Sequence, residues 1–535
     1  MSRVVYGKKT GRASLCKDFE IRLNEEGQMI SLKNRTDVYQ MEWLNGKEIW
    51  GTILAPDELA VRVDRSFTGE GCLRETYRFQ NTSPFDVFVK RDEIGIYTTF
   101  PDDYQSAETC MKQRCHVHAW CGCNTAYLYG LRMGGEAPHL GLVLTEGSID
   151  GYSIVRDESK SSNDRGCLIL HPEAFHLASM ETLTLSWELF WFENREDFFR
   201  RMRRYENVLL VCAERYITFP GESQRLKLIY GGGLGTAPDA LPVHVIRNGT
   251  SEMVFSKTDE EGLSFGVEGM PEEYGEQCWE IQYGPYHTTA KTLALPEFQV
   301  LLKKRCAFIA GKQQYQASDS PLYGAFLIYD NEENRQYYSH LSDHNGGRER
   351  VGMGILLARY LQKFSDPAVE NSLRLFRSYL YRELFDRETG TVYNDICRNN
   401  DQPRLYNYPW AAEFFIEIFR LYRNPEDLES MYRALMAFYR NGGQKMYAIE
   451  IPVADSLELL YENREYKKRE ELLACYRRHA DFMLETGLNY PAHEVNYEQS
   501  IVAPGVDFLL QVYQATKEDK YLEMAKKTAA DSGTF

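Results

Sequence analysis

The spacing of apolar residues changes once along this 535-residue chain, and that change constrains the fold more than any other feature. Before Pro296, apolar and polar residues alternate, as they do from Leu183 to Trp191. A period of two residues is typical of β-strands in antiparallel sheets. After Pro296, apolar residues recur at helical spacing, as they do from Val369 to Leu384. The sequence therefore predicts a multidomain chain with a β part followed by an α part.

Turn-forming residues divide the β part into two regions. Gly, Asn, Asp and Pro recur roughly every 8–12 residues, which is typical of antiparallel sandwiches. A short stretch with helical spacing at residues 195–205 interrupts the strands. We therefore expect a large antiparallel β-sandwich over residues 1–207 and a small Ig-like β-sandwich over residues 208–296.

The α part contains segments with helical spacing that pair into four hairpins. They are expected at residues 350–363, 367–385, 409–423, 425–440, 452–462, 467–486, 499–515 and 518–531. Turns are tight within each pair and longer between pairs, and the helices after long loops begin about 45–60 residues apart. This pattern predicts an (α/α)6-type toroid over residues 341–535, preceded by a linker over residues 297–340. Six hairpins close such a toroid, so four predict an incomplete or C-terminally shortened one.

The loops before the expected inner helices carry carboxylates at corresponding positions. The candidate catalytic residues are Glu349, Glu450 and Glu498. Hydrolysis of a glycosidic bond needs two carboxyl groups in different environments, one protonated as the acid and one ionised. Each of these residues is also explained as an acid that caps a helix. Their convergence at one end of the toroid is what would favour catalysis.

The same loops offer groups that suit a sugar acid. The candidate substrate-binding residues are His344, Arg348, Arg350, Tyr406, Tyr408, Trp410 and Glu494. An Arg guanidinium binds a carboxylate through parallel hydrogen bonds, and an aromatic ring can stack on a sugar ring. The alternative interpretations are that the Arg residues pair with loop acids and that Trp410 belongs to the core.

Charge and composition exclude several classes of partner. The net charge of −16 argues against nucleic acid. No apolar run is long enough for a membrane span, and the N-terminus has no apolar leader, so the 12 cysteines are expected to be reduced thiols of a cytoplasmic protein. The sequence is also compatible with a homo-oligomer. No metal or other cofactor is predicted, because the Cys and His residues between 110 and 123 lack the spacing of a zinc module.

The order of domains resembles the six-hairpin carbohydrate enzymes, namely glucoamylases, disaccharide phosphorylases and several polysaccharide lyases. Within that group, residues 131–135, 140–145 and 497–502 are most similar to bacterial glycoside hydrolase family 154. The resemblance implies a β-glucuronidase-type enzyme. The leading hypothesis is therefore a glycoside hydrolase that removes terminal glucuronate from an oligosaccharide or glycoside.

Two alternatives stay open. The first is a polysaccharide lyase, in which Arg348 or Arg350 neutralises the uronate carboxylate and Tyr406 or His344 removes the C5 proton. The second is a non-catalytic glycan-binding or assembly protein, which an incomplete toroid would favour.

Overall fold

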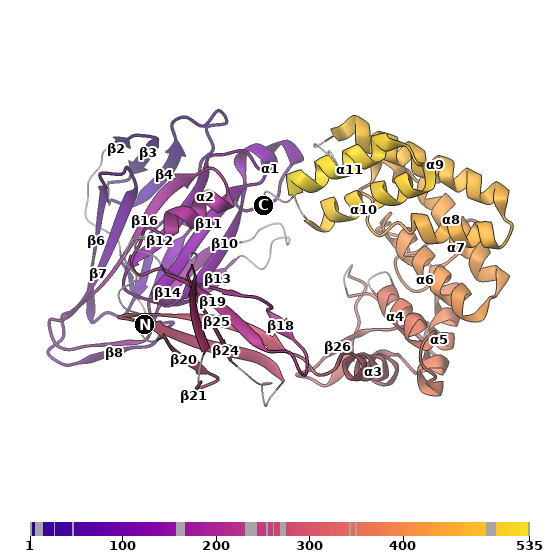
Figure 1. The fold of residues 1–535 in the computed structure, drawn as a ribbon, viewed down its shortest axis with the longest axis horizontal. Helices are drawn as coiled ribbons and strands as arrows, with labels where there is room; N and C mark the ends of the chain where they lie inside the picture. The colour runs from indigo at the N-terminus through magenta and orange to yellow at the C-terminus, as the bar shows by residue number, and fades with distance from the viewer. Residues whose placement is uncertain are drawn as a thin grey trace. The chain divides into compact units, whose positions relative to one another are not determined.

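A computed structural model describes the chain in two compact units, with the boundary after Pro296. The described residues are 3–5, 14–25, 27–44, 48–156, 166–230, 243–252, 255–259, 262–267, 274–341, 344–347, 350–487 and 499–532. The first unit is built mainly of β-strands and the second mainly of α-helices (Figure 1). This arrangement confirms the predicted order of a β part followed by an α part.

Two antiparallel sheets form the first sandwich of the β unit. The larger sheet has the strand order β10 (Cys115–Gly122), β11 (Thr125–Arg132), β12 (His139–Glu146), β16 (Thr182–Phe192), β7 (Leu73–Asn81) and β6 (Leu59–Phe67). The smaller has the order β1 (Arg3–Val5), β5 (Ile53–Ala55), β9 (Gly95–Thr98), β14 (Cys167–Pro172) and β13 (Ile149–Val155). Side chains from both sheets share one core, in which Leu185, Trp187 and Leu189 of β16 are fully buried. These residues belong to the alternating pattern that predicted a strand.

Smaller elements complete this region. They are β2 (Ser14–Cys16), β3 (Phe19–Leu23) and β4 (Met29–Asn34) in one sheet, β8 (Val87–Val89) and β15 (Phe175–Leu177) in another, and the helices α1 (Ala107–Gln113) and α2 (Arg195–Met202). Helix α2 occupies the stretch where helical spacing interrupts the strand pattern. Its Phe198 is fully buried against Phe190 and Phe192 of β16, so the helix covers the outer face of the larger sheet.

The second sandwich is smaller and also has two sheets. One has the order β17 (Leu209–Ala213), β19 (Gln224–Tyr230), β23 (Gly262–Val267) and β22 (Phe255–Asp259). The other has the order β18 (Ile217–Thr218), β25 (Tyr286–Ala294), β24 (Gly275–Tyr283), β20 (Val243–Arg247) and β21 (Thr250–Ser251). Leu226, Leu228, Trp279 and Ile281 fill the space between them. Two facing sheets of short strands agree with the expected Ig-like sandwich.

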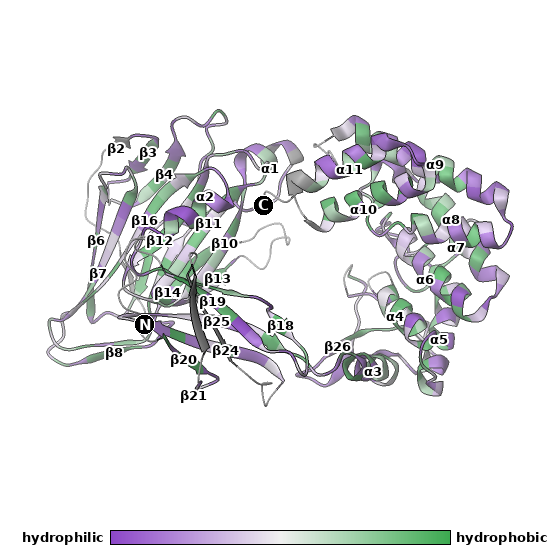
Figure 2. Ribbon diagram, viewed as in Figure 1, coloured by the Kyte–Doolittle hydropathy of each residue, from purple (hydrophilic) through white to green (hydrophobic). Residues whose placement is uncertain are grey.

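Every helix expected in the α part is present. They are α4 (Val351–Leu361), α5 (Pro367–Tyr379), α6 (Asn407–Tyr422), α7 (Pro425–Arg440), α8 (Val453–Glu462), α9 (Tyr466–Thr486), α10 (Gln499–Thr516) and α11 (Asp519–Ser532). Helices α4, α6, α8 and α10 contact one another in that order, and each packs on the helix that follows it. They are therefore the inner helices, and α5, α7, α9 and α11 are the outer ones. Figure 2 shows apolar and polar residues on different faces of these helices, as a two-layer arrangement requires.

Residues 297–340 differ from the expected linker. They include α3 (Phe298–Phe308), a π-helical turn at Ile309–Gln313, and the β26–β27 hairpin (Ile328–Asp330 and Arg335–Tyr337). Cys306 of α3 and Phe326 are buried in the core of the helical unit. The apolar residues of α3 are spread around the helix, so periodicity does not reveal it. Within the described ranges, no helix has both the length and the apolar character needed to cross a bilayer.

Candidate functional site

The loops that precede the inner helices α4 and α6 are joined by hydrogen bonds. The Gly346 N–H donates to Oδ1 of Asp395 (3.4 Å), and the hydroxyl of Tyr379 donates to the Gly346 carbonyl (3.2 Å). Nearby, the Asn407 amide donates to Oδ1 of Asn394 (2.8 Å). Polar side chains from two loops that are far apart in sequence are thereby held together near the starts of two inner helices.

Close backbone approach explains why one of these loops contains two glycines. A Cβ atom at Gly347 would lie 2.2 Å from the Asn394 carbonyl oxygen, and a Cβ atom at Gly346 would lie 3.1 Å from the Tyr379 hydroxyl. Real Cβ atoms do not come within 2.2 Å of a backbone oxygen, so the first contact is possible only for glycine. The Gly346-Gly347 pair therefore fixes how closely the two loops meet.

A Tyr–His–Asp group lies where these loops meet. The Tyr338 hydroxyl donates to Oδ2 of Asp395 (2.8 Å), and Nδ1 of His340 lies 3.1 Å from the same oxygen and 2.9 Å from the Tyr338 hydroxyl. The Asp395 side chain is only 4% exposed, whereas that of His340 is 75% exposed. A buried carboxylate thus holds one edge of an imidazole ring whose other edge faces solvent.

The hydrogen bonds define what each member of this group can do. Because the Asp395 carboxylate can only accept, the proton of a neutral His340 ring is placed on Nδ1, and the lone pair is on Nε2. Nε2 can therefore take a proton from a bound molecule, and Asp395 would stabilise the imidazolium that forms. Burial, followed by the hydrogen bond to Asp395, raises the pKa of Tyr338, which stays a neutral donor.

Two of the candidate binding residues lie in the same loop as His340. The ring of His344 meets that of Tyr337 edge-on, with 5.3 Å between centroids. Arg350 is half-buried at the start of α4, and its backbone N–H donates to the Gly347 carbonyl (3.2 Å). Both residues are therefore positioned by the loop that Asp395 anchors.

The aromatic candidates of the second loop have different environments. Tyr406 and Trp410 pack together with 4.9 Å between ring centroids, and the Tyr406 hydroxyl contacts the Arg404 guanidinium. Trp410 is half-buried, and its indole N–H has no hydrogen-bond partner within the part of the chain that the structure describes. Tyr408 differs from the expected ligand contact, because its side chain is buried in the helical core and its hydroxyl accepts a hydrogen bond from Asn441 (3.1 Å).

Of the candidate carboxylates, the structure describes only Glu450. Glu450 is exposed on the turn before α8, with a left-handed backbone angle φ of 48°. The remaining candidates lie outside the described residues: Glu349, Glu498, Arg348 and Glu494.

Sequence reasoning missed Tyr338, His340 and Asp395. His340 lies just before the charged loop that drew attention, and Asp395 follows it by 55 residues, in a loop with no distinctive motif. The only local signal is the Tyr-Ser-His run at residues 338–340. This run indicates a site only when the Asp395 carboxylate is known to lie beside Tyr338 and His340.

A second polar group links the inner helices by ion pairs. Arg359 of α4 contacts Glu413 and Glu417 of α6, with 3.0 Å between its Nε and Glu417 Oε1. Arg420 of α6 bonds Asp455 of α8 at 2.6 Å and also contacts Glu417. Burial, opposed by Arg359 and supported by Glu417, raises the pKa of Glu413 to about 7. The arrangement joins three neighbouring inner helices and leaves one carboxyl group that titrates near neutral pH.

The raised pKa of Glu413 predicts a pH-dependent stability. Its ordinary pKa is 4.5, so between pH 4.5 and 7 the folded state binds more protons than the unfolded state, and stability falls as the pH rises. Glu413→Gln removes this titration. Its stability relative to the wild type should therefore increase by about 1–3 kcal/mol from pH 5 to pH 8. Urea unfolding of both proteins at the two pH values measures the change, and an equal difference at both would contradict the assignment.

Comparison with known proteins reveals an extensive structural similarity to a solved structure. No protein-family model and no curated protein matches the sequence. A solved structure described as a polysaccharide lyase has a TM-score of 0.84 and 27% identity, and the alignment covers 98% of this chain and 83% of that one. A D-mannose isomerase (TM-score 0.31, 11% identity, covering 42% of this chain and 67% of that one) is far less similar. So is an endoglucanase from Alicyclobacillus acidocaldarius (TM-score 0.24, 10% identity, covering 60% and 78%).

These comparisons bear on the family hypothesis. The similarity to the polysaccharide lyase extends through both units of the chain, and it supports the broad class of six-hairpin carbohydrate enzymes. It does not single out glycoside hydrolase family 154, and between the earlier hypotheses it favours the lyase over the hydrolase.

Proposed function

We propose that this chain is a polysaccharide lyase that cleaves a uronate-containing glycan by β-elimination. The observation that carries the proposal is the exposed His340 imidazole, held through Nδ1 by the buried Asp395 carboxylate. A base oriented by a third group is the arrangement that proton abstraction requires. Similarity to a solved polysaccharide lyase over nearly the whole chain supports the same reaction class.

The reaction follows from these groups in one sequence. Nε2 of His340 takes the proton from C5 of the uronate, the C5–H electrons form a C4–C5 double bond, and the bond from C4 to the glycosidic oxygen breaks. The departing oxygen takes a proton back from the His340 imidazolium. Asp395 stabilises the imidazolium between the two transfers, as a buried carboxylate does for a catalytic histidine.

Removal of the C5 proton also requires that the uronate carboxylate be neutralised. Arg350 is the described cation of the loop that carries His340 and His344, and a guanidinium matches a carboxylate in shape and charge. The Tyr406–Trp410 pair offers an aromatic surface on which a neighbouring sugar can stack. Glu450 has no part in this mechanism, since elimination needs no second carboxyl group.

The products distinguish elimination from hydrolysis. We expect incubation with a panel of polysaccharides, each containing one type of uronate, to give oligosaccharides that absorb in the ultraviolet. Their masses should be one water lighter than those of hydrolysis products. Products with the full mass of added water and no absorbance would instead support the glycoside hydrolase hypothesis. Binding without any product would support the non-catalytic alternative.

Arg350→Ala tests recognition of the carboxylate. Loss of one charge-assisted hydrogen bond costs about 1.5–3 kcal/mol, so affinity for a uronate oligosaccharide should fall roughly 10- to 150-fold. After chemical reduction of its carboxyl groups, the same oligosaccharide should bind to Arg350→Ala and to the wild type with equal affinity. Calorimetry with both ligands measures this, and an equal loss for both would mean that Arg350 only supports the loop.

A further inference from the structure

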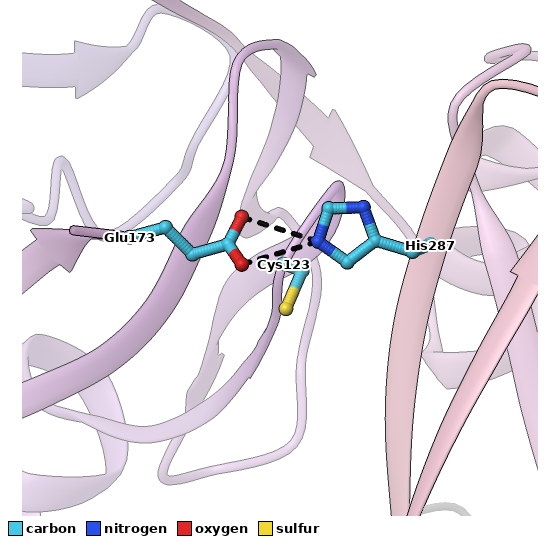
Figure 3. A group of neighbouring side chains, drawn as sticks. All are labelled: Cys123, Glu173 and His287. Atoms are coloured by element: carbon cyan, nitrogen blue, oxygen red, sulfur yellow. Dashed lines mark hydrogen bonds and ion pairs between the residues drawn. The ribbon is translucent and has the colours of Figure 1, made fainter. Parts of the chain in front are cut away.

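Three side chains of different chemistry meet where the two β-sandwiches contact each other. Figure 3 shows the side chains of Glu173 and His287 pointing toward each other, with Cys123 beside them. Each offers one potential ligand atom, and these atoms all lie within 4.8 Å of one another. Nε2 of His287 is 3.1 and 3.2 Å from the two carboxylate oxygens of Glu173. Cys123 and Glu173 belong to the first sandwich and His287 to the second, so the group bridges two domains of the β unit.

The backbone holds the thiol in place. Cys123 lies in the turn between β10 and β11 with a left-handed φ of 61°. Its N–H donates to the Ile149 carbonyl (2.9 Å), and the Ile149 N–H donates back to the Cys123 carbonyl (3.0 Å). A non-glycine residue in this conformation persists only where the surroundings enforce it. The position of the Cys123 main chain is therefore set before any ligand arrives.

The other two side chains are positioned by neighbours of this turn. The His287 N–H donates to Oδ1 of Asn124 (2.9 Å), and the Asn124 N–H donates to the His287 carbonyl (3.2 Å). The Ser148 hydroxyl donates to the Glu173 carboxylate. The bonds to Asn124 fix the main chain at His287, and the bond from Ser148 orients the Glu173 carboxylate, as hydrogen bonds to ligating carboxylates do in metal sites.

The types of ligand favour a cation. Sulfur, imidazole nitrogen and carboxylate oxygen are the ligand types that zinc takes, and atoms bound to a tetrahedral zinc ion lie roughly 3.3–3.8 Å apart. The observed spacing allows that geometry with small side-chain shifts.

We propose that Cys123 Sγ, a Glu173 oxygen and His287 Nε2 bind one zinc ion that cross-links the two β-sandwiches. The side chains of Glu173 and His287 are 36% and 42% exposed, so the ion has an entry path and a water molecule completes its coordination. Binding converts the Cys123 thiol to a thiolate and releases one proton to solvent. The spacing of the Cys and His residues between 110 and 123 did not predict a zinc site, because spacing gives no way to place Glu173 and His287 beside Cys123. The inference is independent of the proposed lyase activity, since all three residues belong to the β unit.

The experiment compares zinc binding by the full chain and by four variants after removal of metal with a chelator. Competition with a chromophoric indicator should give one zinc ion per chain in the wild type. Affinity should fall at least about tenfold in Cys123→Ser, His287→Ala and the more conservative Glu173→Gln. Cys212→Ser, which removes an exposed thiol from β17 of the second sandwich, should bind like the wild type.

Two further measurements keep the proposal testable if one variant folds poorly. Cobalt bound to the wild type should show a thiolate charge-transfer band that Cys123→Ser lacks and Cys212→Ser retains. Zinc should raise the melting temperature of the wild type and of Cys212→Ser but not of the ligand variants. Equal zinc affinity in the wild type and all three ligand variants would overturn the proposal, and the group would then be an ion pair beside a buried thiol.

Discussion

His340→Ala is expected to lower kcat for a uronate polysaccharide by about 10²–10⁴-fold, the contribution of a positioned general base. KM should change little, because the proposed carboxylate contact is made by Arg350. Initial rates of ultraviolet absorbance increase, measured over a range of substrate concentrations, separate the two constants. Wild-type rates in this variant would exclude His340 as the base.

Substitutions of its two partners test the assignment of roles. Asp395→Asn removes the charge that stabilises the imidazolium, so its kcat should fall by a similar factor. Tyr338→Phe is the matched control, because Tyr338 donates to Asp395 and does not touch the reacting atoms in this mechanism. It should retain most of the activity. If Tyr338→Phe were inactive and His340→Ala active, the phenol would be the base instead.

Gly347→Ala is expected to disrupt the site through the backbone. The added Cβ would lie 2.2 Å from the Asn394 carbonyl oxygen, so the two loops must move apart. Overpacking of this kind costs about 1–3 kcal/mol, and a displacement of about 1 Å at the chemistry costs about 10²-fold in rate. Both losses should appear in the same variant, measured by urea unfolding and by the lyase assay.

Gly352→Ala, five residues further along in α4, is the control for this change. Nothing lies within 4 Å of a Cβ atom built there, and alanine favours a helix over glycine by about 0.5–1 kcal/mol. This variant should be as active as the wild type and slightly more stable. If both variants lost activity and stability to a similar extent, the contact with Asn394 would not explain the effect of Gly347→Ala.

The elements that sequence predicts well are those specified by neighbouring residues. Helix α5 starts where Asp366 caps the N–H groups of Ala368 and Val369, with Pro367 in its first turn. Its buried positions include Leu373, which belongs to the apolar stripe that predicted the helix. Capping and periodicity act over a few residues, so they can be read without knowing the rest of the fold.

The candidate site was predicted less completely, because its contacts depend on the path of the chain. The loop before α4 was predicted to carry substrate-binding residues, and His344 and Arg350 of this loop follow His340 closely in sequence. The pairing of His340 with Asp395 was not predicted, since it joins residues 55 positions apart. The contact between Glu173 and His287 spans 114 positions and two domains. Local patterns contain no information about such separations, whereas the folded backbone fixes them.

The end of α5 shows how the Asp395 loop is tied to the helical framework. After Tyr379 the helix widens into a π-helical turn, Leu380–Leu384, and Glu383 in this turn accepts a hydrogen bond from the Cys397 N–H (2.7 Å). A π-helical turn holds an extra residue compared with an α-helical one.

This widened turn has a consequence for insertions and deletions. Deleting one residue from 380–384 would restore α-helical geometry and rotate the remaining helix end by roughly 100°, the angle between successive residues of an α-helix. Glu383 would then turn away from Cys397, and the loop that carries Asp395 would lose this anchor. The chain length between α5 and α6 is therefore constrained at its first turn. The exposed turn at Glu388 and Thr389 is held as well, because Arg433 donates to the Glu388 carbonyl (2.8 Å) and Arg440 donates to the Thr389 carbonyl.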